Sequence, residues 1–102
     1  MKPQTVINKM REYTQDFREQ LGKGDIESIP ALIENVGTFF RELMQEIPRC
    51  EFEILEISTF VVCVDRFGTS CAQQDLEKAA ATLNEMEDVI RSVEERCQFE
   101  AV

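Results

Sequence analysis

The chain has 102 residues, a length typical of one domain, of which 43% are hydrophobic, 30% charged and 8% aromatic. This composition excludes a disordered or low-complexity protein. Eleven Lys and Arg side chains against twenty Asp and Glu give a net charge of −9. That charge argues against direct binding of nucleic acid or of an anionic membrane surface, because both require a basic surface. We interpret residues 1–102 as a single small acidic domain.

Two further features of the whole sequence predict a cytoplasmic protein without a cofactor. No run of 18 apolar residues could form a transmembrane helix, and no apolar signal segment follows Met1–Thr5. The four cysteines, Cys50, Cys63, Cys71 and Cys97, form no Cys-x-x-Cys motif, and the chain has no histidine, so we predict no metal site. Reduced thiols are the expectation, although four cysteines also permit two disulfides.

The first predicted element is an amphipathic helix from about Gln4 to Leu21. Its apolar side recurs at steps of three and four residues, which is typical of a helix with one buried face. That side consists of Ile7, Met10, Thr14, Phe17 and Leu21. The glycines at positions 22 and 24 predict the end of the helix, because glycine readily adopts the left-handed conformation of a helix C-cap.

A second helix is predicted from Ser28, as N-cap, to Pro48, with Pro30 tolerated in the first turn. Gly37 lies inside this helix at a cost of about 1 kcal/mol relative to alanine, which favours close packing of a neighbouring element there. The apolar face is wide. It consists of Ile29, Ile33, Val36, Phe40, Leu43 and Ile47, extended by Leu32, Phe39 and Met44.

Residues 50–67 predict β-structure. Apolar and polar residues alternate over 50–54, and Phe60–Val64 is a continuous apolar block rich in β-branched side chains, which fit a pleated surface. We expect a short hairpin that bends near Glu56–Thr59. A single bulged strand and a third helix remain the alternatives. Arg66–Thr69 predicts a turn.

The last predicted element is a long C-terminal helix. The sequence Ser70–Gln73 resembles a capping box and predicts where the helix begins. The apolar residues then follow steps of three and four without a break, which is typical of a coiled-coil seam. This seam consists of Leu76, Ala79, Leu83, Met86, Ile90, Val93 and Cys97.

These elements predict an α+β fold with two N-terminal helices, a short β-hairpin or bulged strand, and a long C-terminal helix. The alternative is an all-α four-helix bundle. Because one hairpin covers less apolar surface than the second helix and the last seam present, the excess predicts contact with a second copy or with a helix of another protein. Burial of the helices against each other within one copy is the simpler alternative. The predicted partner-binding residues are Leu76, Leu83, Met86, Ile90, Val93, Phe39 and Phe40.

No pattern in the sequence predicts catalysis. The chain lacks a histidine base, and its glycines form no phosphate-binding loop. Cys71 is the strongest candidate nucleophile, because it falls in the first turn of the predicted last helix, where the helix dipole lowers a thiol pKa. The acidic residues Glu51, Glu53 and Glu56 fit a solvated strand face better than a carboxylate pair. We therefore predict neither an enzyme nor any catalytic, metal or cofactor site.

The resulting prediction for function is a non-catalytic protein–protein interaction module, such as an adaptor, a chaperone or an inhibitory subunit, that acts through its amphipathic helix faces. Its partner would be a protein, either a second copy in a homodimer or a heterologous helix. The excess of negative charge lies after residue 24 and raises an alternative. In that alternative the protein is an acidic decoy that blocks a nucleic-acid-binding enzyme.

Overall fold

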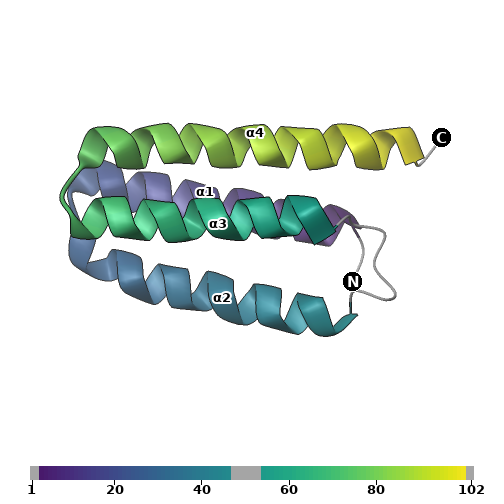
Figure 1. The fold of residues 1–102 in the computed structure, drawn as a ribbon, viewed down its shortest axis with the longest axis horizontal. Coiled ribbons are helices and arrows are strands. Elements are labelled where there is room, and N and C mark those ends of the chain that lie inside the picture. Colours follow the sequence, from purple (N-terminus) through teal and green to yellow (C-terminus); the bar gives the residue numbers. More distant parts are fainter. Residues whose placement is uncertain (1–2, 47–53, 101–102) are drawn as a thin grey trace.

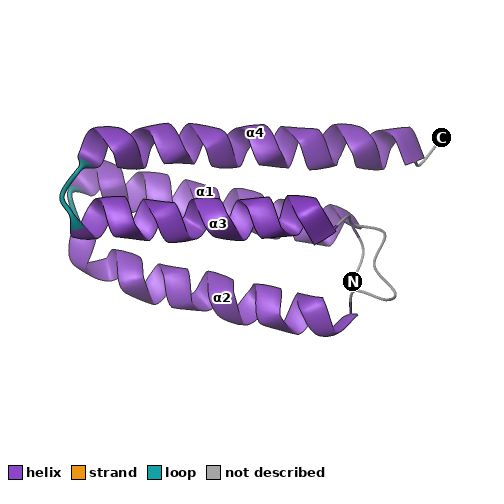
Figure 2. Ribbon diagram, viewed as in Figure 1, coloured by secondary structure: helices purple, strands orange, loops and turns teal. Residues whose placement is uncertain are grey.

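The computed structural model describes residues 3–46 and 54–100, and all of its regular elements there are helices (Figure 2). They are α1 (Pro3–Lys23), the 3-10 turn η1 (Ile26–Ser28), α2 (Ile29–Glu46), α3 (Ile54–Ala72) and α4 (Leu76–Glu100). No residue of the two described ranges belongs to a strand. The first two predicted helices are confirmed as helices, but the predicted end of the second at Pro48 lies outside the described residues. The Ser28 hydroxyl donates to the carbonyl of Asp25 at 3.2 Å instead of accepting from an N–H of α2 as an N-cap would.

The four long helices form an antiparallel bundle in which each helix packs against the next and α4 returns to α1 (Figure 1). The α1–α2 and α3–α4 connections lie at one end of the bundle. The α+β prediction is therefore wrong, and the alternative four-helix bundle is correct. The predicted β-hairpin or bulged strand at 50–67 is replaced from residue 54 onward by α3, and residues 50–53 lie outside the described part of the chain.

Helix α3 forms because its apolar residues also follow a helical period. One side of it is fully buried in the bundle, and the residues of that side are spaced by three or four. They are Ile57, Phe60, Val64, Phe67 and Cys71. The β-branched valines lower the helix propensity by only a few tenths of a kcal/mol each, whereas burying one large apolar side chain contributes roughly 1.5–3 kcal/mol. The predicted turn at 66–69 lies inside α3.

The end of α3 is fixed by a left-handed residue, Gln74, with φ 60°. Its N–H donates to the carbonyl of Cys71 at 3.0 Å, and the N–H of Asp75 donates to the carbonyl of Ser70 at 2.9 Å. These two bonds form a Schellman C-cap. The Asp75 carboxylate then caps α4, because its Oδ1 accepts from the N–H of Lys78 at 3.2 Å. The predicted capping box at Ser70 is therefore wrong.

The same C-cap ends α1, this time with the glycine that the sequence predicts. Gly24 has φ 73°, and its N–H donates to the carbonyl of Leu21 at 3.1 Å. The N–H of Asp25 donates to the carbonyl of Gln20 at 3.0 Å. The two turns at this end of the bundle thus have one geometry, with glycine at the left-handed position in one and glutamine in the other.

This difference predicts opposite effects for two substitutions. Gln74→Gly is expected to raise the free energy of unfolding by about 0.5–1 kcal/mol, because the left-handed conformation costs a side chain with a Cβ roughly that much. Gly24→Ala is expected to lower it by a similar amount. Urea denaturation followed by circular dichroism measures both values. Changes of the same sign in the two variants would contradict the prediction.

Aromatic rings of α1, α2 and α3 pack against one another in the middle of the bundle. Phe17 of α1 packs on Phe67 of α3 with ring centroids 5.0 Å apart, and Phe40 of α2 packs on Phe60 of α3 at 5.5 Å. Buried hydroxyl groups within the core are satisfied locally. Thr14, for example, donates to the carbonyl of Met10 at 2.8 Å.

Ion pairs join α4 to two of its neighbours. Arg18 of α1 binds Glu87 at 2.7 Å, and Arg66 of α3 binds Glu85 at 3.1 Å. Among the described residues, no ion pair joins α2 to another helix. Helix α2 is therefore held by apolar contacts, such as the edge-to-face contact of its Phe39 with Tyr13 at 5.8 Å.

Candidate functional site

The structure places most of the predicted partner-binding residues inside a single copy. Those that are buried among the helices are Leu83, Met86, Ile90, Val93 and Phe40, while Phe39 is half-buried. Leu76 alone of the seven is exposed, at 48%. Helix α3 covers the apolar surface that a hairpin would have left open. A partner could reach the buried residues only if the bundle opened, and their role in binding stays a prediction.

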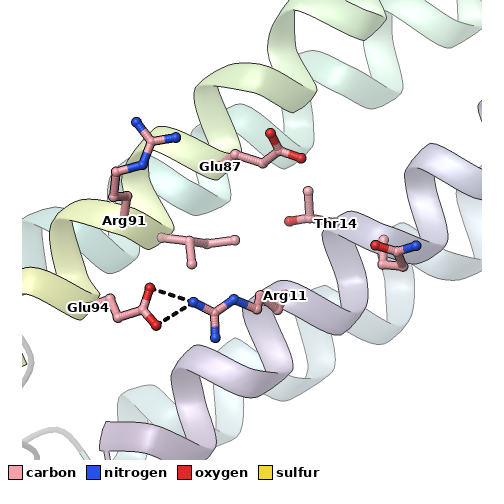
Figure 3. A pocket seen from close by; sticks show the side chains of 7 residues that line it. Arg11, Thr14, Glu87, Arg91 and Glu94 are labelled. Carbon is pink, nitrogen blue, oxygen red and sulfur yellow. Dashed lines mark hydrogen bonds and ion pairs between the residues drawn. The ribbon is translucent and has the colours of Figure 1, made fainter.

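Two depressions on opposite sides of the bundle are candidates for a site. The first is a polar cleft of about 320 Å³ between α1 and α4 (Figure 3). Arg11 of α1 and Glu94 of α4 form an ion pair across it. Glu87 and Arg91 also line it, but Glu87 pairs with Arg18 and Arg91 pairs with Asp88. The charges of this cleft are therefore satisfied within the chain, and they hold α1 and α4 together.

The second depression is apolar and lies between α2 and α3. It consists of two adjoining hollows of about 370 and 290 Å³, which share Ile33 and Asp65. Side chains from residues 26–37 line one wall, and side chains from residues 61–72 line the other. We call this surface the α2–α3 groove. Apart from Asp65 and Thr69 its lining is apolar or glycine.

The groove exposes two valine side chains of α3 that lie off the buried side of this helix. Val61 is 39% exposed and Val62 is 51% exposed. Gly37 adds open space on the opposite wall, since a Cβ there would have no neighbour within 4 Å. The close packing that the sequence predicts at Gly37 is instead found at Gly68, where a Cβ would lie 2.5 Å from Cδ1 of Ile33.

Three charged residues at the groove have no ion pair with any described residue. Asp65 stands in the groove itself. Glu34 and Arg41 do not line the groove, but they are exposed on α2 at helical spacing from the lining residues Pro30 and Gly37. Their charged groups are thus available to another molecule, unlike those of the α1–α4 cleft.

The two described thiols are buried and resist ionisation. Burial raises the pKa of the Cys71 thiol. Burial also raises the pKa of the Cys63 thiol, and the Glu85 carboxylate, 4.0 Å from its Sγ, raises it further, while Arg66 opposes this rise. Cys71 lies in the last turn of α3 rather than in the first turn of α4. The predicted lowering of its pKa by a helix N-terminus is therefore wrong, and both thiols are protonated at neutral pH.

Some of the sequence candidates lie outside the described part of the chain. They are Cys50, Glu51, Glu53 and the side chains of Glu56 and Cys97. Within the described ranges, no three His, Cys, Asp or Glu side chains are grouped so that they could bind a metal ion. None of the described helices combines the length and the apolar character needed to cross a membrane. Comparison with protein-family models, with curated proteins and with solved structures gives no match.

Proposed function

We propose that the protein is a non-catalytic protein–protein interaction module and that a helix of its partner binds in the α2–α3 groove. The observation that carries this proposal is the pair of exposed valines, Val61 and Val62, on the wall of an apolar groove. Binding of an amphipathic helix in an apolar groove between two helices is a recurring mode of recognition. Adaptors, chaperones and inhibitory subunits all use such a surface.

The dimensions of the groove support a helix as its occupant. Its α3 wall extends from residue 61 to residue 72, which at 1.5 Å per residue is about 16 Å, or three helical turns. Covering the exposed parts of Val61 and Val62 removes apolar area from water at roughly 25 cal/mol per Å². The polar α1–α4 cleft offers a partner no comparable gain.

The acidic-decoy alternative has less support from the structure. A decoy needs a dense row of unpaired negative charge, and α4 carries more acidic side chains than any other described helix, seven of the twenty in the chain. Glu85, Glu87 and Glu94 of α4, however, are each paired with an arginine of α1 or α3. These pairs weaken the negative potential along that helix. We therefore favour apolar recognition at the groove.

A pair of matched variants tests the proposal. Val62→Asp places a charge in the groove, whereas Leu76→Asp makes a comparable change at an equally exposed site at the start of α4. We expect the wild type and Leu76→Asp to retain the same protein from extracts of the native source, and Val62→Asp to lose it. The captured protein is then identified by mass, and its binding to the three chains is remeasured with purified components.

Either of two results would overturn this proposal. In the first, Val62→Asp retains the same protein as the wild type. In the second, Leu76→Asp loses that protein while Val62→Asp keeps it, which would move the interface to α4. Far-UV circular dichroism must show the same helix content in all three chains.

A further inference from the structure

We propose that the occupant of the α2–α3 groove is α2 of a second copy of this chain. The two copies pack antiparallel about a two-fold axis, so that α2 of each copy lies in the groove of the other. This inference rests on the proposed function, since it names the helix that the groove receives. Three features of α2 and α3 carry it: a row of exposed residues on α2, the unpaired charges in that row, and Asp65 on α3.

The exposed side of α2 next to the groove has a small residue at its centre and opposite charges on either side of it. Pro30, Glu34, Gly37 and Arg41 follow each other at steps of four, three and four, and all are exposed. Residues at these spacings share one helix face. Gly37 has open space beyond its Cα, which lets a second helix approach closely. The row is therefore shaped for contact with another helix.

The charges of this row are complementary to those of an antiparallel copy. Glu34 and Arg41 are seven residues apart, about 10.5 Å along the axis, and neither forms an ion pair with any described residue. A two-fold axis level with residues 37–38 brings Glu34 of each copy to the level of Arg41 of the other. The same axis creates this contact twice, so the interface closes on itself as a dimer.

Asp65 on α3 adds a second carboxylate at the same level. The contact of Phe40 with Phe60 and the approach of Ile33 to Gly68 fix how α2 and α3 are aligned. By interpolation between these two pairs, Asp65 lies within about two residues, or roughly 3 Å along the axis, of the level of Glu34. Arg41 of the second copy would then lie between two carboxylates on the two walls of the groove.

The net charge of −9 on each copy opposes association but does not decide it. Charges that lie farther apart than about 8 Å are largely screened at physiological ionic strength, whereas the pairs at the groove are in direct contact. In this arrangement each α2 contacts both α2 and α3 of the other copy, and Val61 and Val62 are covered. The dimer thus removes from water the apolar surface that the α2–α3 groove of a single copy leaves exposed.

Charge reversal at the two exposed positions of α2 tests this arrangement. Glu34→Arg and Arg41→Glu each place like charges opposite one another, and each is expected to weaken the homodimer at least about tenfold in sedimentation equilibrium. An equimolar mixture of the two variants restores opposite charges at both contacts. Native mass spectrometry of that mixture is expected to show mainly the heterodimer, which its mass distinguishes from either homodimer.

Glu77→Arg and Lys78→Glu provide the matched control, because they make the same changes in net charge at exposed positions of α4. We expect each of these two variants to dimerise like the wild type. In their equimolar mixture, heterodimer and homodimers are expected in the proportions of random pairing. Circular dichroism of all four variants checks that the bundle is folded.

Several results would overturn the inference. They are a wild-type chain that stays monomeric at about 100 μM, reversed variants that dimerise as tightly as the wild type, or a mixture without preference for the heterodimer. A monomeric chain that still captures a different protein, in a manner sensitive to Val62→Asp, would overturn the second copy as occupant and leave the proposed function standing. Capture that is insensitive to Val62→Asp would overturn the proposed function itself.

Discussion

Leu83→Asp is expected to unfold the protein. Leu83 is fully buried, at 0% exposure, in the core between α4 and the other helices. Truncation of such a leucine alone costs about 2.7–5 kcal/mol, and a carboxylate left in an apolar core adds several kcal/mol more. The sum approaches or exceeds the 5–15 kcal/mol that typically stabilises a domain. Loss of the far-UV helix signal and of the cooperative urea transition measures this effect.

Leu76→Asp is the control for this prediction. It makes the same substitution seven residues earlier in the same predicted seam, at a side chain that is 48% exposed. The free energy of unfolding is expected to change by no more than about 0.5 kcal/mol, since an acidic residue in the first turn of a helix is also favoured by the helix dipole. A Leu83→Asp chain that stays folded and loses only its assembly would show that this seam faces a partner.

The contrast between these two leucines shows what a periodic pattern establishes. The steps of three and four from Leu76 to Val93 predict a helix with one apolar side, and α4 has that side. The pattern does not tell whether that side meets another copy or another helix of the same chain. The answer depends on how much apolar surface the rest of the chain can cover. The predicted hairpin would cover less of that surface than α3 does.

The error in α3 has a local cause. Val61, Val62 and Val64 form a β-branched block, and this composition favoured a strand over the helical spacing of the same segment. The spacing from Ile57 through Phe60 and Val64 to Phe67 was present in the sequence and would have identified the helix. Burial of the apolar side chains at that spacing stabilises α3 by more than the low helix propensity of the valines costs.

The candidate groove could not be predicted from the sequence, because it depends on how α2 and α3 are placed against each other. Its one sequence signal is that Val61 and Val62 fall off the helical spacing of α3, so a helix must expose them. Glu34 and Arg41 gave no signal at all. Isolated exposed charges on a helix are ordinary, and only the position of these two beside an apolar groove gives them meaning.

Phe40→Ala is expected to lower the free energy of unfolding by about 3–5 kcal/mol. The Phe40 side chain is 3% exposed, and its ring lies 5.1 Å from that of Phe39 and 5.5 Å from that of Phe60, measured between centroids. The neighbouring Phe39→Ala provides the matched comparison. Because Phe39 is only half-buried, its truncation leaves a smaller cavity, and we expect less than about half the loss. Urea denaturation gives both values.

The loss of stability in Phe40→Ala is expected to be largest in α2, because of how this helix is attached to the bundle. Among the described residues no ion pair ties α2 to the bundle, so its apolar contacts carry its attachment. Removing the Phe40 ring is therefore expected to reduce amide-exchange protection in α2 more than in α4, which arginines of α1 and α3 also hold. Equal losses of protection in the two helices would show that the bundle opens as one unit.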